Sequence, residues 1–201
     1  MYSMERLLAG EGCGNVAGTD EAGRGPLAGP VVAAAVVLDA EDPIEGLDDS
    51  KKLTPKKREF LFRVIHERAR AVAIAAVSPR EIERRNILQA SLRAMATAVG
   101  RLGVQVGHIL IDGNREIPSP LPQSAVVSGD SKCACVAAAS IVAKVVRDRL
   151  MERFDRRFPQ YGFARHKGYP TRDHLDALRS HGPCFLHRRT FNGVPEPKEG
   201  G

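Results

Sequence analysis

The stretch that decides the fold is residues 16–38, which read VAGTDEAGRGPLAGPVVAAAVVL. Apolar and β-branched residues predict a first strand from about Val16 to Asp20 and a second from Val31 to Leu38. Glu21 begins the glycine- and proline-rich stretch between them, which predicts a loop joining an antiparallel pair. The stretch therefore predicts a sheet with two adjacent carboxylates where its first strand ends.

The rest of the chain alternates predicted strands and helices. Apolar runs predict strands over 71–77, 108–112 and 124–127. Capping residues and glycine stops predict helices over 55–70, 78–100 with a restart near Asn86, 132–158 and 171–182. Alanines crowd the first half of 132–158, so we expect that helix to pack closely against the sheet. The pattern predicts an α/β protein with a mixed five-stranded sheet flanked by helices and a C-terminal helical segment.

The 201 residues are enough for one domain, which we expect over 1–192, with 193–201 as a flexible tail. The longest apolar run, 28–38, spans eleven residues, whereas a membrane helix needs about 18. The N-terminus lacks the charge and apolar stretch of a signal peptide. We expect a cytoplasmic protein that binds no membrane, with a monomer as the default state.

Charge is unevenly distributed along the chain. The formal net charge is +6, but residues 1–50 carry ten acids and two bases, whereas residues 51–201 carry 28 bases and 14 acids. An acidic cluster within a basic chain is typical of a site that holds cations beside a surface that attracts phosphates. Solvated helix faces would produce the same counts.

Cysteines and histidines give little sign of a metal or disulfide site. Four cysteines are too few and too unevenly placed for a disulfide framework. Cys133 and Cys135 lack the spacing of a zinc site and are expected to pack in a helix. The four histidines nearest the C-terminus follow no helical ligand spacing; they are His166, His174, His181 and His187.

Carboxylates at strand ends carry the chemical signal. Asp20 and Glu21 follow the first strand, Asp112 ends the fourth, and Asp130 follows the fifth. If these strands are parallel neighbours, their ends meet at the sheet edge where α/β proteins bind ligands. Singly, each acid could be a turn former or a helix cap. Together they favour a site for Mg²⁺ or Mn²⁺, and hence phosphoryl chemistry of the nuclease kind.

Seven motifs in series resemble those of bacterial ribonuclease HII. They are TDEAGRGPLAGPV (19–31), DDSKKL (48–53), LIDGN (110–114), GDSK (129–132), AASIVAKVVRD (138–148), HKGYPT (166–171) and HRRTF (187–191). The resemblance covers about 16–192 in the family's order. Cys133-Ala-Cys135 departs from it, which affects only local helix packing.

The resemblance implies a ribonuclease H-like fold and metal-dependent cleavage of the RNA strand in RNA–DNA hybrids, including nicking 5′ of ribonucleotides embedded in duplex DNA. It implies two divalent ions, Mn²⁺ or Mg²⁺, products with 3′-hydroxyl and 5′-phosphate ends, and roles in ribonucleotide and RNA primer removal. The matching catalytic carboxylates are Asp20, Glu21, Asp112 and Asp130, of which the first three are the firmest metal ligands.

The same resemblance implies how substrate is read. Gly23, Arg24 and Gly25 match the family loop that recognises the ribose 2′-hydroxyl, and Tyr169 matches the tyrosine that packs on a neighbouring sugar. Lys51, Arg165, His166 and Lys167, together with Lys52, are candidate phosphate contacts by residue type. Each of these could instead be an ordinary solvated side chain.

Three other functions compete with this interpretation. Ribonuclease HIII shares the fold, but it has an additional N-terminal domain, and only about fifteen residues precede the first strand here. A junction resolvase would prefer branched DNA and ignore the 2′-hydroxyl. A non-catalytic nucleic-acid-binding module would bind through the basic region without cleaving.

Overall fold

The computed structural model describes residues 1–196. The strands are β1 (Val16–Ala22), β2 (Val31–Val37), β3 (Ala71–Val77), β4 (His108–Asp112) and β5 (Gln123–Val126). The helices are α1 (Ser3–Gly10), α2 (Pro55–Arg68), α3 (Pro79–Arg85), α4 (Ile87–Gly100), α5 (Ala134–Arg157), α6 (Phe163–His166) and α7 (Arg172–His181), with short 3-10 turns η1 (Gly129–Ser131) and η2 (Pro159–Tyr161).

The five strands form one mixed sheet in the order β3-β2-β1-β4-β5. β1 pairs antiparallel with β2 and parallel with β4, and β4 pairs parallel with β5. The predicted α/β fold is therefore confirmed. The parallel pairings bring the ends of β1, β4 and β5 to one edge of the sheet.

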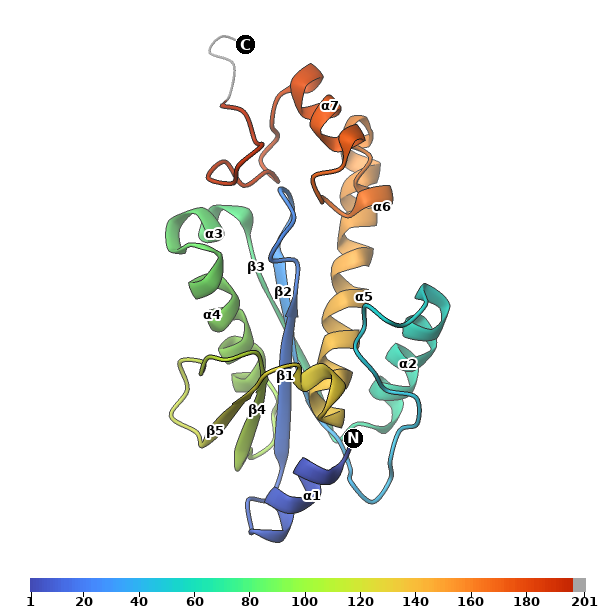
Figure 1. The fold of residues 1–201 in the computed structure, drawn as a ribbon, viewed down its shortest axis with the longest axis vertical. Coiled ribbons are helices and arrows are strands. Elements are labelled where there is room, and N and C mark those ends of the chain that lie inside the picture. The colour runs from blue at the N-terminus through green and yellow to red at the C-terminus, as the bar shows by residue number, and fades with distance from the viewer. Residues whose placement is uncertain (197–201) are drawn as a thin grey trace.

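Helices cover both faces of the sheet (Figure 1). The long helix α5 and α2 cover one face, where alanines of α5 pack with Leu61 and Ile65. Helix α4 covers the other face through Ala90, Ala94 and Ala98. Beyond the end of β1, α6 and α7 form a third apolar cluster with the distal half of α5 around Phe163 and Leu178. Helix α5 thus connects the sheet to the C-terminal segment.

The close approach predicted for the alanine-rich helix is confirmed at Gly18 of β1. A methyl group there would overlap the backbone of Cys135 and Val136 in α5. Only glycine allows the helix and strand to lie this close. The approach fixes β1 against α5 two residues before Asp20. Cys135 is buried in the first turn of α5, as expected, whereas Cys133, also buried, precedes the helix as its N-cap residue with extended backbone.

Some predicted boundaries were wrong. β1 continues to Ala22 rather than ending at Asp20, because Glu21 and Ala22 still pair with β2, so Glu21 lies in the strand and not in the loop. The long helix begins at Ala134 rather than 132, since the chain first makes the turn η1 and then has extended backbone at Cys133. The short helices α1 and α6 were not predicted.

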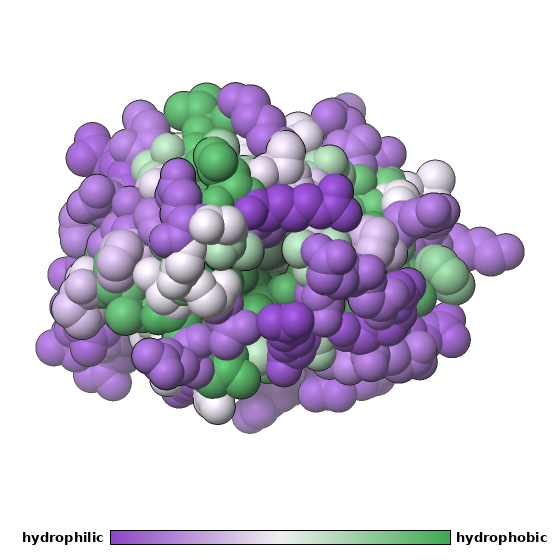
Figure 2. Space-filling model, turned by 90° about the horizontal axis from the view of Figure 1, so that it is seen from below, coloured by the Kyte–Doolittle hydropathy of each residue, from purple (hydrophilic) through white to green (hydrophobic). Residues whose placement is uncertain are grey.

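Residues 193–196 follow the last helix without regular structure, and the remainder of the predicted tail lies outside the described residues. Between residues 1 and 196, no helix combines the length and apolar character needed to cross a bilayer. Hydrophilic side chains dominate the face shown in Figure 2, where hydrophobic residues occur in small groups.

Candidate active site

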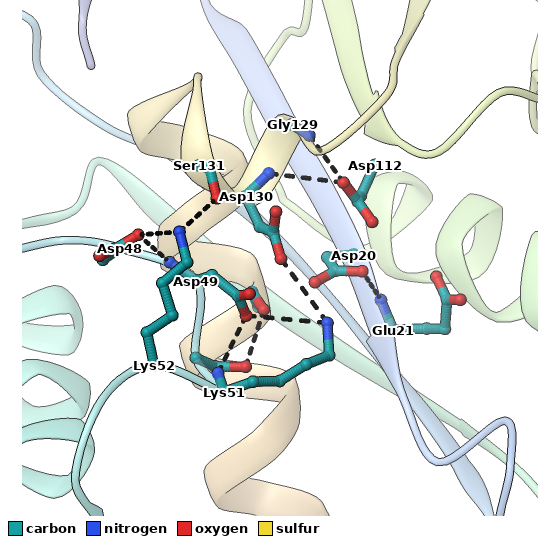
Figure 3. A network of polar contacts seen from close by, with 12 residues as sticks. Asp20, Glu21, Asp48, Asp49, Lys51, Lys52, Asp112, Gly129, Asp130 and Ser131 are labelled. Carbon is teal, nitrogen blue, oxygen red and sulfur yellow. Dashed lines mark hydrogen bonds and ion pairs between the residues drawn. The ribbon is translucent and has the colours of Figure 1, made fainter.

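Three aspartates meet at the sheet edge formed by β1, β4 and β5. Asp20 lies near the end of β1, Asp112 ends β4, and Asp130 lies in η1, just after β5. One carboxylate oxygen of each lies within 4.8 Å of the others. Asp20 and Asp130 are 4% and 5% exposed. The predicted convergence of carboxylates is thus present for these three side chains (Figure 3).

Asp112 is fixed by the backbone of η1. Its Oδ1 accepts hydrogen bonds from the N–H groups of Gly129, at 2.8 Å, and Asp130, at 3.4 Å. A carboxylate held by two backbone donors has little rotational freedom. Asp112 therefore sets the position of the turn that carries Asp130.

The cluster is electrostatically unfavourable without a cation. Burial raises the pKa of Asp20 well above its usual value, and the charges of Glu21 and Asp112 raise it further. Hydrogen bonds from Ser140 and from the Glu21 N–H, at 2.6 Å, oppose this increase. Burial and the charge of Asp112 likewise raise the pKa of Asp130. A set of buried oxygens with this repulsion suits a hard divalent cation, so the three aspartates could hold a metal ion.

Glu21 lies next to this group but outside it. Successive strand side chains point to opposite sides, and Glu21 Oε1 accepts a hydrogen bond from Arg24 Nη1 at 3.3 Å. Burial raises the pKa of Glu21, and the Arg24 charge opposes that. The predicted ligand set was Asp20, Glu21 and Asp112, whereas the oxygens gathered here belong to Asp20, Asp112 and Asp130. The assignment of individual ligands remains a prediction.

The motif at residues 48–53 contacts the turn η1 through two lysines, Lys51 and Lys52 (Figure 3). Lys51 Nζ lies 3.7 Å from a carboxylate oxygen of Asp130 and 3.7 Å from one of Asp49. Lys52 Nζ donates to Ser131 Oγ at 3.1 Å and pairs with Asp48. Lys51 therefore places an exposed positive charge beside the carboxylate cluster.

A cavity of about 540 Å³ joins the aspartates to the predicted recognition residues. Its lining includes, in addition to Asp20, Glu21 and Asp112, the residues Gly23, Arg24, Gly25, Lys51 and Tyr169. Tyr169 is 44% exposed, so much of its ring faces solvent. The structure thus brings the GRG loop, which we define as residues 23–25, to the same cavity as the carboxylates.

The other predicted phosphate contacts do not line this cavity. Arg165 pairs with Asp173 at 3.4 Å, and Lys167 pairs with Glu152 at 2.7 Å. His166 uses both ring nitrogens locally, since Nδ1 accepts from the Gly168 N–H and Nε2 donates to the carbonyl of Tyr161. Their role in substrate binding remains a prediction.

Several residues of the site were missed from the sequence. Ser140, Lys144 and Arg147 of α5 line the cavity, as do Ser50 and Arg58. Ser140 Oγ lies 3.0 Å from Ser50 Oγ and so links Asp20 to the 48–53 motif. The positions 140, 144 and 147 share one helical face, and that spacing is the signal that would have identified them.

Comparison with known proteins identifies the family. The Ribonuclease HII family matches residues 17–194. A ribonuclease HII of Geobacter metallireducens is 54% identical over 196 residues, which cover 98% of this chain and 92% of the relative. Ribonuclease HII 1 of Methylibium petroleiphilum is 57% identical over 178 residues, which cover 89% of this chain and 90% of the relative.

Solved structures share the fold. Ribonuclease H2 from Pyrococcus horikoshii superposes with a TM-score of 0.75 at 29% identity, covering 90% of this chain and 95% of that chain. Bst-RNase HIII, crystallised in complex with Mn²⁺, superposes with a TM-score of 0.68 at 20% identity, covering 90% of this chain and 68% of that chain. The fold is therefore ribonuclease H-like. The chain belongs to the ribonuclease HII family and is a nuclease of the ribonuclease H type.

Proposed function

We propose that this nuclease hydrolyses the RNA strand of RNA–DNA hybrids and nicks duplex DNA 5′ of an embedded ribonucleotide, using two divalent cations. The observation that carries the proposal is the shared cavity. Carboxylates with oxygens within 4.8 Å of one another lie beside a glycine loop and an exposed tyrosine, Tyr169. One side suits a cation and the other suits a sugar.

The cation side belongs to Asp20, Asp112 and Asp130, with Glu21 beside them. The clustered oxygens, together with the raised pKa values of Asp20 and Asp130, fit Mg²⁺ or Mn²⁺, and a relative of the same fold was solved with Mn²⁺. When bound, divalent cations supply Lewis acidity to the phosphodiester and favour ionisation of the attacking water. That water displaces the 3′-oxygen, so the products carry 3′-hydroxyl and 5′-phosphate ends.

The sugar side distinguishes RNA from DNA. The GRG loop can bring backbone donors to the 2′-hydroxyl, since glycine has no side chain to keep a sugar away. Tyr169 offers its ring to the neighbouring sugar, and Lys51 offers a charge to the phosphate. The 2′-hydroxyl is recognised and takes no part in the displacement.

A substrate of this kind arises when ribonucleotides are incorporated into DNA or remain from primers. We therefore propose a role in ribonucleotide and RNA primer removal, in the cytoplasm, with a monomer as the working unit.

The decisive experiment compares three labelled duplexes: one with a single ribonucleotide, one with an RNA strand, and one of DNA only. Each is incubated with protein and Mg²⁺, Mn²⁺ or EDTA. We expect nicking 5′ of the ribonucleotide with either metal, cleavage of the hybrid, and no cleavage of DNA or in EDTA. Failure to nick the single-ribonucleotide duplex under every metal condition would falsify the proposal, and cleavage of branched DNA instead would indicate a resolvase.

A further inference from the structure

Two arginines are almost completely buried near the GRG loop. Arg147 of α5 is 1% exposed, and Arg188, which follows α7, is 0% exposed. Neither forms an ion pair with a carboxylate of residues 1–196. Buried cations are normally paired, because removing a charge from water costs several kcal/mol. Two neighbouring buried arginines without a carboxylate partner therefore require other groups that stabilise their charge.

Both guanidinium groups donate only to backbone carbonyls between residues 23 and 30. Arg188 donates to the carbonyls of Gly23 (2.6 Å), Arg24 (2.9 Å) and Gly29 (2.9 and 3.1 Å). Arg147 donates to those of Ala28 (3.1 Å) and Pro30 (3.1 Å). The two side chains thus hold the loop between β1 and β2 from behind.

The C-terminal segment also pairs with this loop. Arg188 N–H donates to the Leu27 carbonyl at 2.8 Å, and Gly29 N–H donates to the Leu186 carbonyl at 2.8 Å. Leu27 N–H donates to the carbonyl of Gly168, which precedes Tyr169, at 2.9 Å. The loop and Tyr169 are therefore held by one continuous set of contacts.

Glycines make the close approach possible. Gly23 has a φ of 99° and Gly29 a φ of 87°. A methyl group on Gly23 would overlap the Arg147 side chain, and one on Gly29 would overlap Met151. The guanidinium groups consequently reach the carbonyls only because these positions lack side chains.

This arrangement determines where the loop N–H groups point. In a planar trans peptide, the C=O of one residue and the N–H of the next point in opposite directions. The carbonyls of Gly23 and Arg24 face Arg188, so the N–H groups of Arg24 and Gly25 face away from it, on the side of the loop that lines the cavity. Neither N–H donates to an acceptor among the described residues.

The charge strengthens these donors. A cation at a carbonyl oxygen polarises the peptide group and makes its N–H a better hydrogen-bond donor, an effect that is larger in a low-dielectric interior. Burial, and then the Arg147 charge, lower the pKa of Arg188 to about 9, so Arg188 remains charged at neutral pH.

We propose that Arg188, supported by Arg147, is a positioning residue for 2′-hydroxyl recognition: it aims the N–H groups of Arg24 and Gly25 into the cavity. The inference rests on the proposed function. A duplex without the 2′-hydroxyl leaves those donors unpaired, which penalises DNA relative to RNA.

The test is Arg188→Lys, because lysine keeps the charge but cannot reach the carbonyls of Gly23, Arg24 and Gly29 together. Affinities are measured by fluorescence anisotropy in EDTA, for a duplex with one ribonucleotide and for the matched all-DNA duplex. We expect the ratio of the two affinities to fall about tenfold, with little change for DNA. The matched control is Arg189→Lys, the same change at the neighbouring exposed residue, and it should keep the wild-type ratio.

A folded Arg188→Lys protein with an unchanged ratio overturns the proposal, as does an equal loss for both duplexes, which a purely structural role would give. If this variant does not fold, the wild-type protein decides. With ¹⁵N-labelled glycine and arginine, the amide signals of Arg24 and Gly25 should shift more with the ribonucleotide duplex than with DNA. Equal shifts overturn the inference. If the wild-type protein has no ribonucleotide preference at all, the proposed function itself fails.

Discussion

The two sides of the cavity have opposite electrostatics. On one side, Asp20, Asp112 and Asp130 gather negative charge, and burial together with the neighbouring carboxylates raises the pKa values of Asp20 and Asp130. On the other, behind the GRG loop, Arg147 and Arg188 are buried cations, and burial lowers the pKa of each. Each side destabilises the fold when taken alone. A bound cation would relieve the acidic side, whereas the two guanidinium groups are satisfied by backbone carbonyls of residues 23–30.

Substituting the acidic side should have the largest effect on nicking. Asp20→Asn or Asp112→Asn should lower nicking by about 1,000-fold or more, because cation binding is lost. Hybrid binding, measured by anisotropy in EDTA, should change little. Asp42→Asn, at an exposed ion pair with Arg68, is the control and should keep full turnover. Near-normal turnover in the Asp20 variant would remove the metal-site assignment.

Gly23→Ala should disrupt the contact between the GRG loop and Arg147. Its methyl group overlaps Arg147, and the φ of 99° is unfavourable for alanine, so we expect about 3 kcal/mol lower stability in urea unfolding and a large loss of nicking.

Gly103→Ala separates the effect of positive φ from the effect of steric overlap with Arg147. Gly103 also has positive φ, at 70°, but no atom lies within 4 Å of an added methyl group. We expect about 1 kcal/mol lower stability and unchanged nicking. Equal effects at both glycines would show that backbone strain alone matters and that the contact with Arg147 does not.

The acidic side has a pH signature in the metal-free protein. The folded pKa of Asp20 lies above its unfolded value, so its charged form destabilises the fold; this penalty is full above the folded pKa and shrinks as pH falls from there toward the unfolded value. In EDTA, Asp20→Asn should therefore have a higher melting temperature than wild type at pH 8, and the difference should shrink toward pH 5. A constant difference across this pH range would contradict the uncompensated charge at Asp20.

Adding Mg²⁺ at a hundredfold excess over its Kd should stabilise the wild-type protein by about 2.7 kcal/mol.

The smallest effect is expected at Lys51, the exposed cation near both Asp49 and Asp130. Lys51→Gln should weaken duplex binding by only a few fold, equally for RNA-containing and all-DNA duplexes, and reduce the salt dependence by about one unit of slope. Titrations at several salt concentrations test this. A loss confined to the ribonucleotide duplex would assign Lys51 to sugar recognition instead.

The two sides also differ in how well the sequence predicts them. Parallel strands with acids at their ends converge by topology, so the positions of Asp20 and Asp112 could be predicted from local patterns. The same reasoning predicts Asp130, which follows β5, at this edge. That Glu21 lies outside the group depends on β1 continuing to Ala22, which local pattern does not determine.

Arg188 was not predicted, for a different reason. By composition an arginine is a solvated residue, and its burial becomes visible only when its partners are known. Those partners are carbonyl groups, which every residue has, and for Arg188 they lie up to 165 positions away. No sequence pattern marks such a contact in a single chain.

That separation has a consequence for synthesis on the ribosome. Asp20, Asp112 and Asp130 have all been translated once α5 is complete at Arg157, whereas Arg188 follows about thirty residues later, a delay of a few seconds at bacterial elongation rates. A nascent or prematurely terminated chain that ends in this interval holds the carboxylates but not the anchor of its recognition loop. With the role proposed for Arg188, selectivity would therefore be acquired only after residue 188 has been made.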